Sequence, residues 1–312
     1  MKIVVMGTGG VGGYYGGLLA QQKNDVTFIA RGAHLEAIRK NGLQVKSIFG
    51  DFAVVPAKAT DNPADAGHAD LILFCTKTYD TDKAAEAVKS AVGPETAVLS
   101  LQNGVDAVER IGKAVGMEHV IGGATWLSSA VEAPGVIKQV SQFRRIVFGE
   151  LDGSRSERIQ SIHEVLKNTG VTVEVTEDIL KILWTKFVFI SAASSFGSLT
   201  RLPMGDYRSI PETREMITGL MREVEAVARA QEIALDEDVV QKSLDFMDNA
   251  APHIKASMQL DVEGGRRTEL ESMVGVIGRK GREWNVSTPI ADFIYASLLP
   301  VELKARKGSS SP

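Results

Sequence analysis

Three glycines near the start of the chain have the spacing of a phosphate-binding turn. The segment "GTGGVGGYYGG" contains G-x-G-x-x-G at Gly7, Gly9 and Gly12. It lies between an apolar, β-branched run at residues 2–6, which favours a buried strand, and a helical pattern. The first glycine permits a tight turn, the second lets backbone N–H groups approach a pyrophosphate, and the third lets the helix pack against the strand. The turn predicts a dinucleotide site made by Gly7, Thr8, Gly9, Gly10, Val11 and Gly12.

A basic side chain, Arg31, follows the second predicted strand, residues 25–30. NAD-binding domains usually place an Asp or Glu there to accept hydrogen bonds from the ribose 2′-OH. An acid would repel a 2′-phosphate, whereas a guanidinium binds one through paired, charge-assisted hydrogen bonds. The next residue, Gly32, leaves room for a bulky group. An ordinary solvated arginine is the alternative, but the position favours a selector for NADP(H).

The composition is that of an ordinary globular chain, with 312 residues of which 44% are hydrophobic and 24% charged. The net charge of −4 gives no reason to expect nucleic acid or an acidic membrane as a partner. The single cysteine, Cys75, excludes an intramolecular disulfide and fits a reducing compartment. The N-terminal apolar run is too short and too interrupted by glycine for a membrane span, and no signal peptide is expected before it. We therefore expect a cytoplasmic protein.

Metal-dependent and hydrolytic chemistry are both disfavoured by the motifs. The sequence has no H-E-x-x-H or paired-cysteine spacing, and no G-x-S-x-G nucleophile turn. The histidines lie far apart along the chain, at His34, His68, His119, His163 and His253. No metal ligands are expected.

The pattern of elements changes near residue 177. Before it, strand-like runs recur at residues 70–75, 97–101, 145–149 and 171–175, with a helical pattern at residues 81–92. Residues 43–57 read as a hairpin that turns at residues 49–51. After residue 177 the strand signals stop and helical periodicity begins, with a capping-box pattern at Ser209 and Glu212.

This organisation predicts two domains. We expect an α/β Rossmann-type domain at residues 1–177 and an all-α helical domain at residues 178–312, with a polar, frayed tail at residues 304–312. Two-domain oxidoreductases of this plan bind substrate in the cleft between the domains, so polar residues facing that cleft are the candidates for catalysis.

Lys186 is the first such candidate. The helix expected at residues 178–196 places Ile182, Leu183, Lys186 and Ile190 along one face. A lysine within an apolar stripe is unusual, and desolvation would lower its pKa towards the range that suits proton exchange with a substrate oxygen. A lysine whose stem packs while its ammonium reaches water explains the same pattern. Periodicity alone favours that second interpretation.

A second set of candidates lies in "ASMQLDVEGGRRTELES", residues 256–272. Thr268 and Glu271 have the spacing of a capping box, which would make Glu269 a first-turn residue held ionised by the helix dipole. There it could accept a hydrogen bond from a substrate hydroxyl, or simply favour the helix. Ser257 and Asp261 precede a glycine-containing loop and could face the same cleft.

The chain resembles the ketopantoate reductase (2-dehydropantoate 2-reductase) family over nearly its whole length. The matching segments are "GTGGVGGYYG" with Arg31, "CTKTYDT" around Lys77, "LSLQNGVD" around Asn103, "EAPGVIKQ", "LWTKFVF" around Lys186, and "SMQLD" followed by "GGRRTEL". The last two motifs are far more specific than the glycine turn.

The resemblance implies a role for each matching residue. Lys186 would be the general acid that protonates the ketone oxygen. Glu269 would hold the substrate hydroxyl, Asn103 would lie beside the nicotinamide ribose and the substrate, and Ser257 would help to bind the carboxylate. Both Asn103 and Glu269 would also contact the cofactor, and Lys77 would contribute to the same region.

The sequence departs from the family pattern on the helix of Lys186. Where better-studied members carry asparagines on the next two turns, this chain has Ile190 and Ser194. Ser194 can still hydrogen-bond to a substrate, but Ile190 cannot. The expected activity is NADPH-dependent reduction of 2-dehydropantoate to pantoate, in pantothenate and coenzyme A biosynthesis. Because buried polar contacts discriminate strongly between substrates, another branched 2-keto acid is the alternative.

A non-catalytic NADP(H) sensor of the same fold is a further alternative, and the presence of Lys186 and Glu269 argues against it. The expected partner is a small 2-keto acid, with a homodimer left open and neither nucleic acid nor a membrane expected.

Overall fold

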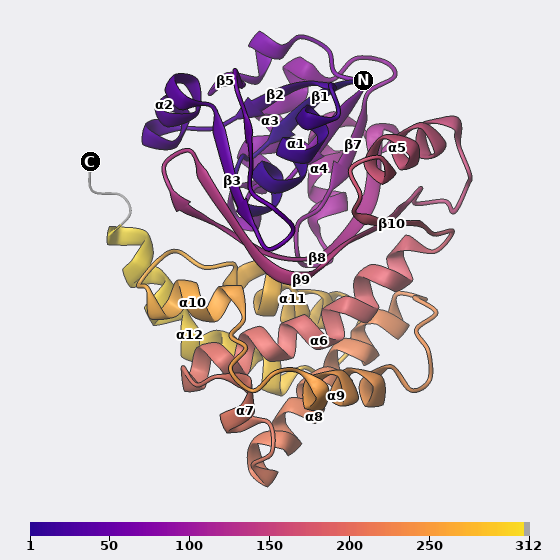
Figure 1. Cartoon of the computed structure of the whole chain (residues 1–312). Helices are drawn as coiled ribbons and strands as arrows, with labels where there is room; N and C mark the ends of the chain where they lie inside the picture. The colour runs from indigo at the N-terminus through magenta and orange to yellow at the C-terminus, as the bar shows by residue number, and fades with distance from the viewer. Residues whose placement is uncertain (309–312) are drawn as a thin grey trace. The chain divides into compact units, whose positions relative to one another are not determined.

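The computed structural model describes residues 1–308. The chain divides into two compact units (Figure 1). The first unit consists of Met1–Gln102 and Ala107–Ile179, and the second is built from Leu180 onwards together with the short segment Asn103–Asp106.

The first unit is an α/β sheet domain, as expected. Its strands are β1 (Lys2–Met6), β2 (Asp25–Ile29), β3 (Leu43–Ser47), β4 (Phe52–Val54), β5 (Lys58–Thr60), β6 (Leu71–Phe74), β7 (Ala97–Ser100), β8 (Val120–Ala133), β9 (Val136–Gly149) and β10 (Thr172–Val175). Its α-helices are α1 (Gly10–Gln21), α2 (Gly32–Asn41), α3 (Thr81–Val88), α4 (Ala107–Val115) and α5 (Glu157–Lys167). Each predicted strand contains an observed one, except that the run at residues 145–149 is only the end of the longer β9. The predicted helix at residues 81–92 continues beyond α3 only as a 3-10 turn, Lys89–Ala91.

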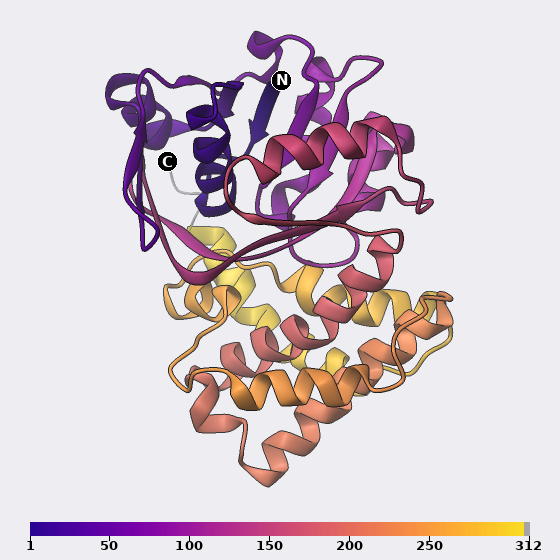
Figure 2. The ribbon, with the colours of Figure 1, turned by 45° about the vertical axis from the view of Figure 1, so that its right-hand side comes forward.

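The strands lie in the order β4-β3-β9-β8-β7-β6-β1-β2-β5, and β10 pairs with β9. The neighbours from β8 through β5 in this order are parallel, as βαβ units require. Alternate side chains of β1 enter two cores. Ile3 and Val5 pack with residues of α1 and α5, whereas Val4 and Met6 pack with residues of α3 and α4. Helices α1 and α5 accordingly lie on one face of the sheet and α3 and α4 on the other (Figure 2).

Two antiparallel hairpins extend this sheet. The predicted hairpin at residues 43–57 is confirmed as β3 and β4, with the turn at Gly50. In the larger hairpin, which was not predicted from the sequence, β8 and β9 pair antiparallel and turn at Gly135. Only the last residues of β9 were predicted, because residues 136–144, "VIKQVSQFR", have neither a continuous apolar run nor a regular alternation of apolar and polar residues.

The regular secondary structure in the described part of the second unit is entirely helical. Its helices are α6 (Ile179–Thr200), α7 (Met204–Tyr207), α8 (Pro211–Ala230), α9 (Val239–Asn249), α10 (Ser257–Glu263), α11 (Val276–Glu283) and α12 (Pro289–Gly308), and a π-helical turn, Glu271–Gly275, precedes α11. Residues 304–308 continue α12, so the prediction of a frayed tail is wrong for these residues. The rest of the predicted tail, residues 309–312, lies outside the described part of the chain.

Helix α6 is the central apolar helix of the second unit. Among residues 1–308 it alone is long and apolar enough to cross a membrane. Of its most apolar stretch of 18 residues, 61% is buried inside the protein. Phe187, Val188 and Ala192 lie in one core with Met221 of α8 and Ile294 of α12. The apolar character of α6 therefore has a packing explanation.

The capping box predicted at Ser209 and Glu212 is wrong. Helix α8 begins at Pro211 with Ile210 at the N-cap, and no side chain among the described residues caps this end. Proline has no N–H to satisfy and its φ is already helical, so it is favoured at the first position of a helix. Pro211 therefore defines the start of α8 without a cap from Ser209.

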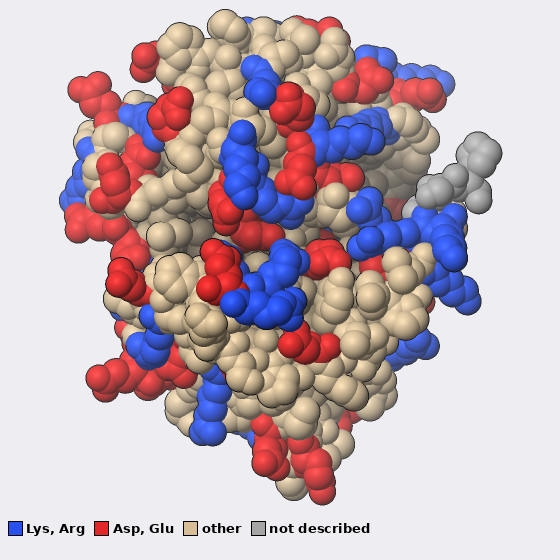
Figure 3. Space-filling model, turned by 180° about the vertical axis from the view of Figure 1, so that it is seen from behind, with Lys and Arg blue, Asp and Glu red and all other residues tan. Residues whose placement is uncertain are grey.

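Charged side chains of both signs are mixed over the face shown in Figure 3. The first unit also contains exposed ion pairs, such as Lys113 with Glu109 and Arg155 with Glu177. Such pairs contribute little to stability because water screens them.

Candidate active site

The glycine turn joins β1 to α1 in the geometry expected of it. Gly7 has φ +98°, and a Cβ there would lie 2.8 Å from the backbone nitrogen of Thr76. A Cβ on Gly12 would lie 2.2 Å from the carbonyl oxygen of Gly7. Any other residue at either position would push the turn and the helix apart.

The N-terminus of α1 offers backbone N–H groups for an anion. Its N-cap is Gly9, no described side chain caps it, and its first turn contains no acid. A Cβ on Gly9 would meet no atom within 4 Å, so the approach to its backbone is open. These features fit a pyrophosphate, because the first N–H groups of a helix lack partners within the helix.

The side chain of Thr8 is buried, while Gly10 and Val11 are the first two residues of α1. The backbone nitrogen and the hydroxyl of Thr8 both donate to the carbonyl oxygen of Ile29, at 3.0 and 2.9 Å. Its side chain therefore holds the turn to the end of β2. Gly10 is the first residue of α1, and Val11, the second, is half-buried.

Arg31 is exposed at the N-cap of α2, directly after β2. Its guanidinium pairs with no carboxylate in the described part of the chain. A Cβ on the following Gly32 would meet no atom within 4 Å, so the space beside Arg31 is open. The position can hold an additional phosphate.

Lys77 lies where β6 ends, at the N-cap of a 3-10 turn, Thr78–Asp80. The amide of Gln102, which follows β7, donates to the carbonyl oxygen of Thr76 at 2.9 Å and to the hydroxyl of Thr81 at 2.9 Å. The ends of these two neighbouring parallel strands are therefore tied together on the carboxyl side, where α/β sheets bind ligands.

In the second unit, Lys186 of α6 meets Asn103. The Lys186 ammonium donates to Asn103 Oδ1 at 2.9 Å. Desolvation lowers the pKa of Lys186 to about 8, and the nearby charge of Glu269 opposes part of that shift. Glu269 is 6% exposed. Chain positions far apart in sequence thus bring an amide, an amine and a carboxylate into one electrostatic environment.

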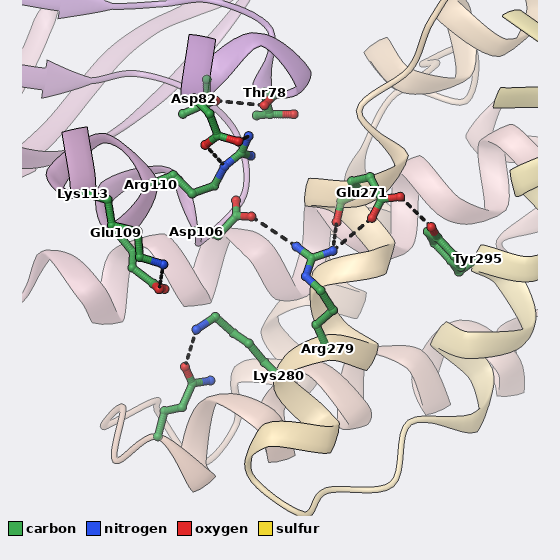
Figure 4. A network of polar contacts seen from close by, with 12 residues as sticks. Thr78, Asp82, Asp106, Glu109, Arg110, Lys113, Glu271, Arg279, Lys280 and Tyr295 are labelled. Atoms are coloured by element: carbon green, nitrogen blue, oxygen red, sulfur yellow. Dashed lines mark hydrogen bonds and ion pairs between the residues drawn. The ribbon is translucent and has the colours of Figure 1, made fainter. Parts of the chain in front are cut away.

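The segment that carries Asn103 is held within the second unit (Figure 4). Arg279 of α11 donates to the buried carboxylate of Asp106 at 3.4 Å and to Glu271 at 3.0 Å. Tyr295 of α12 donates to Glu271 at 2.5 Å. A Cβ on Gly104 would lie 3.1 Å from the carbonyl oxygen of Ser272, in the π-helical turn, so the backbones pack closely here. The sequence gives no local signal for this network beyond the "QNGVD" motif, which contains Asp106.

The capping box predicted at Thr268 and Glu271 is formed only in part. The Thr268 hydroxyl accepts a 3.3 Å bond from the nitrogen of Leu270, the first helical residue. The backbone nitrogen of Thr268 donates instead to Glu302, at 2.7 Å, and its hydroxyl donates there as well. Glu302 therefore takes the place that Glu271 was expected to fill. Glu269 directly precedes the helix and is not a first-turn residue.

The remaining candidates occupy three different settings. Ser257 is exposed as the first residue of α10, and Asp261 on the same helix accepts from Arg266 at 3.0 Å. Ser194 is 2% exposed on α6. Ile190, one turn after Lys186, is half-buried against the helical core. Among residues 1–308, no group of three or more His, Cys, Asp or Glu side chains has the arrangement of a metal site.

Comparison with known proteins places the chain among the ketopantoate reductases. The sequence profile described as "Ketopantoate reductase PanE/ApbA" matches residues 3–153, and the profile of its C-terminal part matches residues 178–302. The chain belongs to the ketopantoate reductase family. It is thus an oxidoreductase of a nicotinamide-dependent reductase family.

Several known proteins are similar to it over almost their whole length. It is 31% identical to the "Uncharacterized oxidoreductase YkpB" of Bacillus subtilis, covering 96% of this chain and 98% of that one. It is 30% identical to a 2-dehydropantoate 2-reductase of Pyrococcus horikoshii, covering 95% and 96%. A solved ketopantoate reductase of Ralstonia eutropha matches with a TM-score of 0.90 and 29% identity, over 98% and 100%.

Proposed function

We propose that this chain catalyses the NADPH-dependent reduction of 2-dehydropantoate to pantoate, with Lys186 as the general acid. The observation that carries the proposal is the 2.9 Å bond between the Lys186 ammonium and Asn103 Oδ1, on a lysine whose pKa is lowered to about 8. An amine with such a pKa is mostly protonated at neutral pH and yet gives up its proton readily. Membership of the ketopantoate reductase family supports the same reaction.

The cofactor would be held by the first unit. The uncapped N-terminus of α1 suits the pyrophosphate, and Arg31 suits the 2′-phosphate that distinguishes NADPH from NADH. Lys77 would add a positive charge to the cofactor region. When bound, NADPH supplies the hydride that reduces the C2 ketone.

Lys186 would donate its proton to the ketone oxygen as negative charge develops there. Its bond to Asn103 fixes the direction of the ammonium, and Glu269 keeps it charged against the cost of burial. A positioned general acid contributes about 10²- to 10⁴-fold in rate, which corresponds to roughly 3–5 kcal/mol of the barrier.

Glu269 would distinguish the substrate by its hydroxyl. A buried carboxylate that accepts a hydrogen bond penalises a ligand without the donor, because the acceptor is then left unsatisfied. Asn103 and Ser194 would add polar contacts, while Ser257 would bind the substrate carboxylate and Asp261 would contribute nearby. The product would enter pantothenate and coenzyme A synthesis, and the single cysteine is consistent with a cytoplasmic enzyme.

A second candidate substrate is another branched 2-keto acid. The observation that favours it is Ile190, an apolar residue one turn after Lys186 that packs against the helical core. An apolar side chain there cannot hydrogen-bond to a substrate and leaves Glu269 to recognise the hydroxyl with fewer polar neighbours.

The test is NADPH oxidation against a panel of 2-keto acids that includes 2-dehydropantoate and its deoxy analogue, 2-oxo-3,3-dimethylbutanoate. We expect a higher kcat/KM for the hydroxylated acid, and Glu269→Ala should remove most of the preference. A wild-type enzyme indifferent to the hydroxyl would support the second candidate. NADPH turnover with none of the acids would contradict the reductase proposal itself.

A further inference from the structure

His34, in the first turn of α2, connects the glycine turn to the tip of the β8–β9 hairpin. Its Nε2 lies 2.8 Å from the carbonyl oxygen of Thr8, and its Nδ1 accepts a hydrogen bond from the backbone nitrogen of Gly135 at 3.0 Å. The two contacts link segments separated by more than a hundred residues, and all of them belong to the first unit.

The backbone partners determine the protonation state of the ring. The Gly135 N–H can only donate, so Nδ1 must be unprotonated, and the Thr8 carbonyl can only accept, so Nε2 must carry the hydrogen. Burial lowers the pKa of His34 below its ordinary value, which favours the same neutral ring.

The hairpin also packs directly against the start of α1. A Cβ on Gly10 would lie 2.3 Å from the carbonyl oxygen of Ser129 in β8, and a Cβ on Gly13 would lie 2.7 Å from the Ile137 side chain in β9. The other side of the turn is held by Thr8, which donates twice to Ile29. The Thr8 carbonyl is thus fixed from the hairpin side through His34.

We propose that His34 is a positioning residue for the dinucleotide, which sets cofactor affinity by holding the Thr8 carbonyl and the hairpin tip in place. The inference rests on the proposed function, because it assumes that the glycine turn binds the pyrophosphate. His34 acts through the backbone and not on the adenosine end. Its effect therefore falls equally on NADPH and NADH, unlike that of Arg31.

The test is His34→Ala in the full-length protein, with dissociation constants for NADPH and NADH measured by fluorescence titration. We expect both to weaken by about tenfold, or about 1.4 kcal/mol, while kcat at saturating cofactor stays unchanged. His119→Ala is the matched control, because His119 also bonds a backbone carbonyl of the first unit, that of Thr96, at 2.9 Å. It should leave both affinities unchanged.

Rescue and spectroscopy separate positioning from a general loss of stability. His34→Gln can place an amide near the Nε2 position and should restore most of the affinity. Nitrogen NMR of the wild-type ring should show an unprotonated Nδ1 at neutral pH. Unchanged affinities in His34→Ala, a protonated Nδ1, or a loss confined to NADPH would overturn the inference. A wild-type protein that binds neither dinucleotide would instead contradict the proposed function.

Discussion

Lys186 illustrates how far a single residue can be interpreted from sequence. Its place in an apolar stripe marked it, but the same pattern fitted a lysine whose ammonium reaches water. Only the folded chain brings in Asn103 and Glu269, which lie 83 residues before and 83 residues after Lys186 in the sequence. The stripe predicts burial of the stem, whereas the partners of the ammonium depend on tertiary structure.

Lys186 should give the reaction a characteristic pH dependence. A general acid works only while protonated, so kcat should be constant below the pKa of about 8 and fall tenfold per pH unit above it. Lys186→Ala should lower kcat by about 10²- to 10⁴-fold with little change in NADPH affinity. The measurement is kcat at saturating substrates against pH.

Asn103→Ala provides the control for this pH dependence. Removing Oδ1 deprives the charged ammonium of an acceptor, so the pKa should fall and the basic limb should move to lower pH. A wild-type limb near the ordinary lysine pKa, or one that Lys186→Ala leaves in place, would show that another group donates the proton.

Arg31 should select between the two dinucleotides. Arg31→Ala removes a guanidinium that can form paired bonds to a 2′-phosphate, so NADPH affinity should fall by about 10- to 100-fold while NADH affinity changes little. Lys40→Ala, which removes an exposed charge from the last turn of the same helix, should affect neither. Equal losses for both cofactors in Arg31→Ala would remove the selector role.

Among the helices and strands, periodicity predicted the elements well and their ends poorly. The first βαβ unit, the β3–β4 hairpin and the apolar helix α6 follow from local sequence, because each has a pattern with a definite period. Neither predicted capping box formed completely. Helix α8 begins at Pro211 without the box predicted at Ser209 and Glu212. In the box predicted at Thr268, the acceptor for its N–H is Glu302, 34 residues away. Long-range partners of this kind leave no local signal.

The Glu302 carboxylate should be a large contributor to the stability of the second unit. It is 1% exposed and accepts from the nitrogen and hydroxyl of Thr268 and from Arg306. Glu302→Ala would leave the buried Thr268 N–H without a partner, so the free energy of unfolding should fall by roughly 2–4 kcal/mol. Urea denaturation followed by circular dichroism measures the change.

The matched control is Glu225→Ala. Glu225 forms an ion pair with Arg229 at the same four-residue spacing as Glu302 and Arg306, but the Arg229 side chain is 40% exposed. Its removal should cost less than about 1 kcal/mol. Equal destabilisation by both variants would mean that Glu302 contributes only as a surface residue does.

At the scale of the whole molecule, the candidate site of the second unit is not contiguous in sequence. Asn103–Asp106 lies between β7 and α4 along the chain, yet it belongs to the helical unit. Arg279→Ala, which removes the bonds to Asp106 and Glu271, should lower kcat by about three- to tenfold without changing NADPH affinity.

A double-mutant cycle tests whether Arg279 acts through Asn103. If it does, Arg279→Ala should add little to Asn103→Ala, because residues that act through one another have non-additive effects. Arg282 lies on the same helix as Arg279 and forms an exposed pair with Asp292 of α12, so Arg282→Ala should leave kcat unchanged. Additive losses would place Arg279 outside the path to Lys186.

The interleaving of Asn103–Asp106 limits how members of this family can exchange parts. A recombinant joining residues 1–179 of this chain to the helical half of a relative would combine the relative's lysine with an asparagine segment from this chain. Its counterparts of Asp106 and Arg279 would then come from different parents. A crossover that also transfers residues 103–106 keeps these partners together. Recombination and grafting at this family's apparent domain border should therefore succeed more often when the donor's four-residue segment accompanies its helices.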